Sequence, residues 1–167
     1  MEHIFGPVLS RRLGFSLGVD LVPFKTCSLD CIYCQAGKTT HKTIERKSYV
    51  SLESVMPELK DALKQSQKID YITLSGYGEP TLNLDLGRIN TAIKKITDIP
   101  VAVLTNGTLL HLESVRDELM AAELVVTSLD AVSQEIFCEI NKPHPDSNVT
   151  LMISGLKSFR EYLSCNI

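Results

Sequence analysis

Three closely spaced cysteines are the residues of this chain with the most evident capacity for chemistry. Cys27, Cys31 and Cys34 have the spacing C-x3-C-x2-C. Thiolates are soft ligands that hold iron–sulfur clusters or zinc, and a loop this short can wrap three sulfurs around one centre. The spacing therefore predicts a metal site in this loop.

The number of cysteines in the loop favours an iron–sulfur cluster. A structural zinc site is completed by four protein ligands, whereas three thiolates on a four-iron cluster leave one iron open to an outside ligand. Zinc would need a fourth donor, and His41 is the nearest candidate. Three unrelated buried thiols are the remaining interpretation. Cys138 and Cys165 lie far along the chain and are expected to be structural or incidental.

Apolar segments along the chain predict the elements that must position this loop. We expect strands at 17–22, 71–75, 101–104 and 124–127 and helices at 55–63, 86–96, 112–119 and 149–163. Continuous apolar strands that alternate with helices are typical of an α/β fold, with a parallel sheet and helical crossovers. Ser54 is expected to cap the first helix and to place Pro57 in its first turn. The polar stretch 37–47 is expected to be an exposed loop.

Polar and glycine-rich segments follow each of the four predicted strands. They are the cysteine loop, Gly76–Pro80, Thr105–Gly107 and Ser128–Asp130. The loops at the carboxyl ends of parallel strands build the active sites of such folds. With neighbouring strands in sequence order, the four segments are predicted to form one site.

Length and composition fit one globular domain over residues 1–167. The chain is 44% hydrophobic and 22% charged, and its net charge of −3 argues against general binding of polyanions. No apolar run approaches the roughly 18 residues of a membrane span, and Met1–Val8 lacks the features of a signal peptide. We therefore expect a cytoplasmic protein with no membrane partner.

Four motifs together resemble those of the radical S-adenosylmethionine (radical SAM) superfamily. The cysteine loop, with aromatic Tyr33 directly before its last cysteine, is similar to the cluster loop of that family. Gly76–Leu82 resembles its glycine–glutamate motif. Leu104–Gly107 and Thr127–Ala131 resemble its third- and fourth-strand motifs. The resemblance covers nearly the whole chain.

The leading part of the chain resembles one branch of that superfamily. Phe5–Gly14 and Asp20–Lys25 look like the branch that includes the tRNA wyosine-forming iron–sulfur oxidoreductases and many uncharacterised prokaryotic relatives. The family fold is a partial (β/α)6 barrel, of which this chain would supply about four β/α units. We expect a leader segment over 1–15 and a partial barrel over 16–167. The chain would then be a fragment, or a partner or missing C-terminal segment would complete the barrel.

The resemblance implies two cofactors and a reaction. Cys27, Cys31 and Cys34 would hold a [4Fe–4S] cluster whose free iron chelates S-adenosylmethionine. An electron from the reduced cluster would yield methionine and a 5′-deoxyadenosyl radical that abstracts hydrogen from a substrate. The electron would come from an external donor of flavodoxin or ferredoxin type; the motifs do not identify the substrate, for which a tRNA and a small metabolite are the two options. A non-enzymatic electron-transfer or metal-binding module is the alternative.

The resemblance also implies contacts with S-adenosylmethionine. The backbone of Gly76 and Gly78 would approach the ammonium group closely, and the carboxylate of Glu79 would pair with it. Ser128 and Asp130 carry groups that bind a ribose or a carboxylate, although such residues also cap helices.

Two further residues and one basic loop have both a functional and a plain interpretation. Tyr33 would stack near the adenine of the cofactor or simply pack. Asn106 would contact the cofactor, or Asn106-Gly107 would only form a turn. A basic loop would bind a phosphate-bearing substrate such as tRNA or remain solvated. Its residues are Lys38, Lys42, Arg46 and Lys47.

Overall fold

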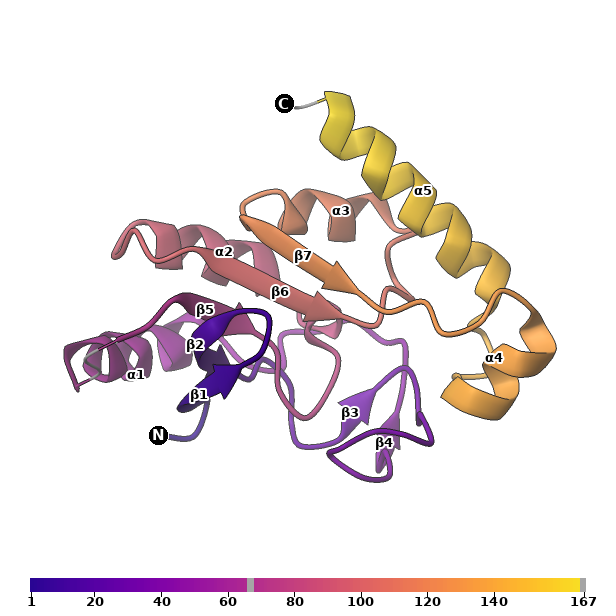
Figure 1. Ribbon diagram of the computed structural model, residues 1–167, viewed down its shortest axis with the longest axis horizontal. Helices are drawn as coiled ribbons and strands as arrows, with labels where there is room; N and C mark the ends of the chain where they lie inside the picture. The colour runs from indigo at the N-terminus through magenta and orange to yellow at the C-terminus, as the bar shows by residue number, and fades with distance from the viewer. Residues whose placement is uncertain (66–67, 166–167) are drawn as a thin grey trace.

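A five-stranded sheet forms the centre of the protein in the computed structural model, which describes residues 1–65 and 68–165, with side chains as far as Leu163 (Figure 1). The strands are β1 (Ile4–Ser10), β2 (Gly14–Val19), β5 (Tyr71–Leu74), β6 (Val101–Thr105) and β7 (Leu124–Thr127). Their order is β1-β2-β5-β6-β7; β1 is antiparallel to β2 and the other pairs are parallel. The predicted α/β class and the sequential strand order are confirmed, and the sheet is consistent with a partial barrel.

Helices lie between successive parallel strands and also follow the last strand of the sheet. They are α1 (Leu52–Gln65), α2 (Leu86–Lys94), α3 (Glu113–Leu119), α4 (Gln134–Asn141) and α5 (Val149–Cys165), with a short 3-10 helix η1 (Pro80–Leu82). Helix α2 packs between α1 and α3, and these three crossover helices lie along one face of the sheet (Figure 1). None of the helices within the described residues is long and apolar enough to cross a membrane.

The main core lies between the sheet and the crossover helices. Strand side chains such as Leu17, Ile72 and Val103 are almost completely buried there, together with residues of α1, α2 and α3. The alternate positions of the strands carry smaller or polar groups. Among them, the hydroxyls of Ser16 and Thr73 form a hydrogen bond across β2 and β5. The period-two alternation of strands thus separates an apolar helix-facing side from a more polar side.

The structure contains elements that the sequence analysis did not predict. The expected leader segment over 1–15 contains β1, which pairs with β2 at the edge of the sheet. The expected exposed loop over 37–47 contains β4 (His41–Lys42), which pairs with β3 (Thr26–Cys27). Helix α4 was missed altogether. Its amino end is capped by Ser133, whose hydroxyl accepts a hydrogen bond from the backbone N–H of Ile136.

The predicted start of the first helix is wrong by one turn. Ser51, not Ser54, is the cap, since the Ser51 hydroxyl accepts a hydrogen bond from the backbone N–H of Ser54. Pro57 therefore lies inside α1, beyond the first turn. There its ring removes one hydrogen bond of the helix, at a cost that the burial of Val55 and Leu59 in the main core offsets.

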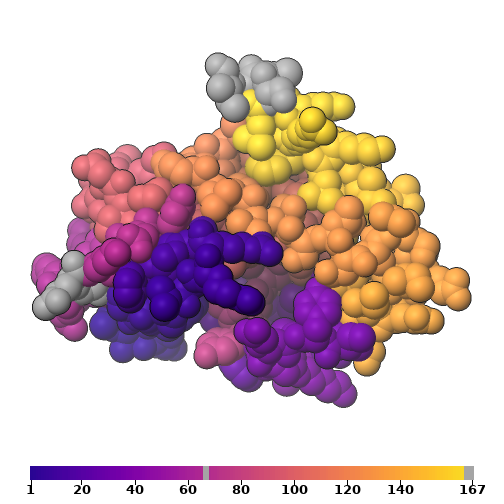
Figure 2. Space-filling model, in the orientation of Figure 1, coloured from indigo at the N-terminus to yellow at the C-terminus, as the bar shows by residue number. Residues whose placement is uncertain are grey.

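A second, smaller core supports the cysteine loop. Leu29 of the loop is buried against Phe137 of α4 and Met152 of α5, and Cys27 and Cys31 pack against this cluster. In Figure 2 the surface of the loop region lies beside that of α4. The loop is therefore positioned by elements more than 100 residues further along the chain.

Candidate functional site

The carboxyl ends of β2, β5 and β6 meet through hydrogen bonds between their loops. The backbone N–H of Glu79 donates to the carbonyl of Thr26 at 3.0 Å. The backbone N–H of Asn106 donates to the Glu79 carboxylate at 2.7 Å, and the Asn106 side chain donates to the Ser28 hydroxyl at 2.9 Å. Three of the four predicted loops thus form one connected structure beside the cysteines.

Glu79 is sealed inside this structure. Only 2% of the residue is exposed, and its carboxylate accepts four hydrogen bonds. The donors are the hydroxyls of Thr81 and Thr105, both at 2.6 Å, and the backbone N–H groups of Thr81 and Asn106. Burial raises the pKa of Glu79, and these hydrogen bonds oppose that rise. The contacts give Glu79 a scaffold role that the sequence did not indicate, and its contact with a cofactor ammonium stays a prediction.

Gly76 and Gly78 allow close approaches within the protein. A Cβ on Gly78 would lie 2.2 Å from the carbonyl oxygen of Thr26, and one on Gly76 would lie 2.1 Å from the carboxyl carbon of Asp20. Asp20 in turn accepts a hydrogen bond from the backbone N–H of Tyr77 at 3.0 Å. The glycines therefore let the loop after β5 pack tightly against the loop after β2.

Asn106 is held on both sides of its amide. Its oxygen accepts hydrogen bonds from the backbone N–H and the hydroxyl of Thr108, while its nitrogen faces the Ser28 hydroxyl and lies 3.5 Å from the Cys27 sulfur. Gly107 has a φ of +78°, as the predicted turn requires. Asn106 thus forms the turn and also contacts the cysteine loop.

Cys27 lies in the most enclosed part of the loop. Burial and the nearby carboxylate of Glu79 raise the pKa of the Cys27 thiol to about 12. The thiol of the free chain is therefore protonated at neutral pH, and metal binding would have to displace that proton.

Cys31 lies beside a group of polar side chains from three other positions. The amide nitrogen of Asn141, the last residue of α4, is 3.3 Å from the Cys31 sulfur and 2.8 Å from a carboxylate oxygen of Asp130. The same oxygen accepts a hydrogen bond from the hydroxyl of Tyr33. Burial and this hydrogen bond raise the pKa of Tyr33. Predicted site residues Tyr33 and Asp130 are therefore brought together, with 54% of Tyr33 exposed.

Cys34 has a cation beside it. The ammonium group of Lys25 lies 3.3 Å from the Cys34 sulfur, and Lys25 is only 2% exposed. Lys25 also has a left-handed backbone (φ 59°), and its carbonyl accepts hydrogen bonds from the backbone N–H groups of Thr40 and His41. The loop is thereby closed on the short strand β4.

Ser128 does not form a hydrogen bond with the other predicted site residues, all of which lie in the described part of the chain. It is exposed beyond the end of β7, as are Leu129 and Asp130. The alternative role of Ser128 or Asp130 as a helix cap is wrong, because Ser133 caps α4. A cofactor contact by Ser128 stays a prediction.

Three side chains of the basic loop contact other parts of the protein. Arg46 pairs with Glu118 of α3 and donates to the carbonyl of Thr81 at 2.8 Å. Lys42 donates to the carbonyl of Lys142 at 2.8 Å, and Lys47 lies over the ring of Tyr49. A charge that is held by protein partners is less available to a phosphate. Phosphate binding by this loop remains a prediction.

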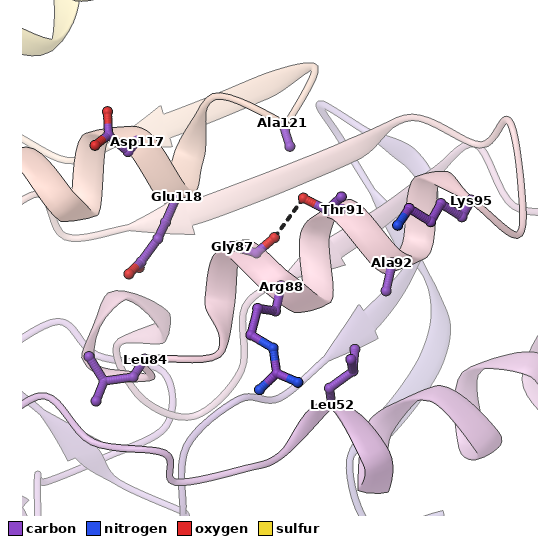
Figure 3. Close-up of a pocket in the computed structure, with 10 residues that line it drawn as sticks. All are labelled: Leu52, Leu84, Gly87, Arg88, Thr91, Ala92, Lys95, Asp117, Glu118 and Ala121. Carbon is purple, nitrogen blue, oxygen red and sulfur yellow. Dashed lines mark hydrogen bonds between the residues drawn. The ribbon is translucent and has the colours of Figure 1, made fainter.

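A cavity of about 600 Å³ lies away from the cysteines, along α2 (Figure 3). Its lining includes Leu52 of α1, Arg88 of α2 and Glu118 of α3. The hydroxyl of Thr91 donates to the carbonyl of Gly87 on its wall. None of the predicted site residues lines this cavity, so the chemistry of the chain places the site at the cysteine loop instead.

Comparison with known proteins decides the family. A sequence model of the Radical SAM superfamily matches residues 21–166 of the chain. The chain belongs to the radical SAM superfamily. This match spans every loop described above, from the cysteines to Asp130, and it extends into α5.

Several relatives of this radical SAM protein share its sequence over nearly its whole length. A protein named GTPase Obg from Brachyspira hyodysenteriae is 46% identical over 159 residues, which are 95% of this chain and 23% of that protein. A UPF0026 protein of Methanocaldococcus jannaschii is 41% identical over 163 residues, 96% of this chain and 50% of the relative. A UPF0026 protein of Synechocystis is 38% identical, with 95% and 59% covered. The chain spans between 23% and 59% of the length of these relatives.

The residues around the cysteines fit the iron–sulfur cluster that the superfamily implies. Each of the three sulfurs faces an N–H donor, from Asn106 at Cys27, Asn141 at Cys31 and Lys25 at Cys34. Hydrogen bonds to the sulfurs are one of the means by which proteins adjust a cluster. Within the described part of the chain, no group of three or more His, Cys, Asp or Glu side chains is arranged to hold a single metal ion.

The buried residues that support the site were not predicted from the sequence. Ser28 and Asn141 were given no role and Thr105 was named only as part of a loop, although all three are buried and form hydrogen bonds with the site. Helix α4 had a usable signal, because Ser133 is a good cap and Pro143 is a good stop. Cys138 lies on the exposed part of α4, and the side chain of Cys165 lies outside the described residues.

Proposed function

We propose that this chain is the cofactor-binding part of a radical SAM enzyme. It would hold a [4Fe–4S] cluster on Cys27, Cys31 and Cys34 and bind S-adenosylmethionine at the same edge of the sheet. The observation that carries the proposal is the set of three N–H groups, from three different segments, that face the three sulfurs. Such donors stabilise the negative charge of thiolate ligands.

The bound cluster would supply the electron that cleaves S-adenosylmethionine to methionine and a 5′-deoxyadenosyl radical. The chain's own residues would orient the ligands and the cofactor. Lys25 places a positive charge beside Cys34, and Glu79 fixes the loops after β5 and β6 around Cys27. Exposed groups at the rim, which include Tyr33, Ser128 and Asp130, are available for polar contacts with the cofactor.

The division of roles between buried and exposed groups sharpens the proposal. Glu79 already accepts four hydrogen bonds, so we assign it a scaffold role beside its predicted contact with the cofactor ammonium, and we assign the backbone of Gly76 to the same ammonium. Gly76 is exposed at the rim of the site. An external donor of flavodoxin or ferredoxin type would reduce the cluster. Membership in the wyosine-forming branch, with an RNA substrate, stays a prediction.

The test is anaerobic reconstitution of the chain with iron and sulfide. We expect one four-iron cluster by iron and sulfide analysis and by electron paramagnetic resonance. Changing any of Cys27, Cys31 or Cys34 to alanine is expected to abolish it, while Cys138→Ala is the matched control that retains it. Zinc in place of iron would contradict the proposal.

A second measurement distinguishes an enzyme from an electron carrier. S-adenosylmethionine is expected to change the resonance spectrum of the reduced cluster, because the fourth iron has no cysteine ligand. An electron-transfer module has no need of that cofactor. Identical spectra with and without S-adenosylmethionine would favour the electron-transfer interpretation.

A further inference from the structure

The end of helix α4 places an amide group against one of the three cysteines. Asn141 is the last residue of α4 and is only 1% exposed. Its nitrogen lies 3.3 Å from the Cys31 sulfur and 2.8 Å from the Asp130 carboxylate. We infer that Asn141 is a positioning residue for Cys31, and that its amide, oriented by Asp130, donates a hydrogen bond to the sulfur and stabilises negative charge there. This inference rests on the proposed function, in which Cys31 is a cluster ligand.

The neighbours of Asn141 fix which end of its amide faces the sulfur. An ionised carboxylate accepts hydrogen bonds and cannot donate them, so the nitrogen must face Asp130. The Tyr33 hydroxyl uses its own hydrogen for the same carboxylate oxygen. One N–H of Asn141 therefore serves Asp130 at 2.8 Å, and the second faces both the Cys31 sulfur at 3.3 Å and the Tyr33 hydroxyl oxygen at 3.4 Å. The amide oxygen has no hydrogen-bond partner among the described residues, so the amide is oriented from its nitrogen side.

Backbone contacts hold Asn141 at a fixed distance from the loop. The N–H of Asp30 donates to the carbonyl of Asn141, and the N–H of Ile32 donates to the carbonyl of Ile140, both at 2.9 Å. These two bonds lie on either side of Cys31 in the sequence. Lys142 then adopts a left-handed backbone that ends the helix. The carboxyl end of α4 and the cysteine loop therefore form one rigid unit, in which the amide has little freedom to leave the sulfur.

The contact has a predicted electrochemical consequence. A hydrogen bond to a ligand sulfur stabilises the reduced cluster more than the oxidised one, because the reduced cluster carries more negative charge. Asn141 is therefore expected to raise the reduction potential of the cluster. A residue that only filled space at this position would leave the potential unchanged.

The experiment compares cluster-loaded variants of the full 167-residue chain. Asn141→Leu removes the amide and keeps a similar volume. Asn90→Leu is the matched control, because Asn90 is also a fully buried asparagine at a helix position, with no contact to the cysteine loop. The midpoint potential is measured by redox titration followed by electron paramagnetic resonance. We expect Asn141→Leu to shift the reduction equilibrium about tenfold toward the oxidised cluster, or about 59 mV lower for one electron. Asn90→Leu is expected to keep the wild-type potential.

The outcomes separate this inference from the proposed function. A cluster-loaded Asn141→Leu variant with the wild-type potential overturns the inference and leaves the proposed function standing. A wild-type chain that takes up no four-iron cluster overturns both. Should leucine prevent folding, as judged by circular dichroism, Asn141→Ala removes the amide without adding bulk, and its potential decides in the same way. Loss of iron from a folded Asn141 variant, with full loading of Asn90→Leu, would support the positioning role.

Discussion

Two carboxylates at the same edge of the sheet have opposite environments. Glu79, after β5, is buried and accepts four hydrogen bonds from the loops after β5 and β6. Asp130, after β7, is exposed and accepts hydrogen bonds from Tyr33 and Asn141. Both residues belong to motifs that resemble cofactor-binding motifs. From the sequence, Glu79 was expected to contact the cofactor ammonium, whereas Asp130 was expected to contact the cofactor or to cap a helix; their difference in burial was not predicted.

This difference divides the carboxyl-terminal edge of the sheet into a fixed part, which is buried and hydrogen-bonded, and an open part, which is exposed to solvent. The fixed part is centred on Glu79 and ties Thr26, Thr81 and Asn106 together, so its loss is expected to affect folding. The open part is centred on Asp130, whose carboxylate is exposed and for which a cofactor contact is predicted. Substitutions in the fixed part should therefore be seen in the free energy of unfolding, and those in the open part in ligand binding.

The largest expected effect tests this division directly. Glu79→Ala leaves four donors without an acceptor in a buried site, and we expect it to lower the free energy of unfolding by about 3–5 kcal/mol. Asp130→Ala is the comparison variant and is expected to cost less, about 1–2 kcal/mol, because its exposed carboxylate accepts two hydrogen bonds rather than four. Urea denaturation measures both. An equal loss of unfolding free energy in the two variants would contradict the difference between the two carboxylates.

The next effect concerns the close contact between the loops after β2 and β5. Gly78→Ala would place a Cβ 2.2 Å from the Thr26 carbonyl oxygen. We expect the free energy of unfolding to fall by about 2–3 kcal/mol, because the backbone at Gly78 and at Thr26 must move apart. Gly37→Ala serves as the control: it meets no atom within 4 Å, and its φ of +80° costs about 1 kcal/mol. A Gly78→Ala variant as stable as Gly37→Ala would show that the contact is looser than described.

A smaller effect is expected at the link between the cysteine loop and the loop after β6. Ser28 is fully buried and hydrogen-bonds to Thr108 at 2.7 Å and Asn106 at 2.9 Å. Ser28→Ala is therefore expected to lower the free energy of unfolding by about 1–2 kcal/mol. Ser128→Ala, at an exposed position, is expected to stay within about 0.5 kcal/mol of wild type. Thermal and urea unfolding would measure both variants, and similar costs would place Ser28 outside the fixed part.

The smallest effect is a pH dependence at Asp20. Burial raises the pKa of Asp20 above its usual value of 3.8, despite hydrogen bonds from Tyr77 and Val22. Between the usual and the raised pKa, the folded chain binds more protons than the unfolded chain, so the free energy of unfolding falls as pH increases. Asp20→Asn removes this contribution. Urea denaturation from about pH 4 upward is expected to give a flatter curve for the variant, and parallel curves would contradict the burial of Asp20.

The sequence by itself determined the cysteine loop, the alternation of strands and helices and the superfamily. These are local signals: a spacing of three cysteines, and apolar periodicities of two or 3.6 residues. The sequence also located the loops after β5 and β6, because glycines and Asn106-Gly107 mark turns on their own. Helix α4 was within reach of the same signals but was missed, and the cap of α1 was assigned one turn too late.

Only the tertiary structure decided what the site residues contact. Asn141 and Cys31 are 110 positions apart, and Tyr33 and Asp130 are 97 apart. No periodicity connects residues so distant, because their meeting depends on how α4 and α5 pack on the second core. The enclosure of Glu79 likewise requires Thr105 and Asn106 from the next strand. Residue types and spacing specified the chemistry available to this chain, whereas long-range packing decided which carboxylate is sealed and which stays open.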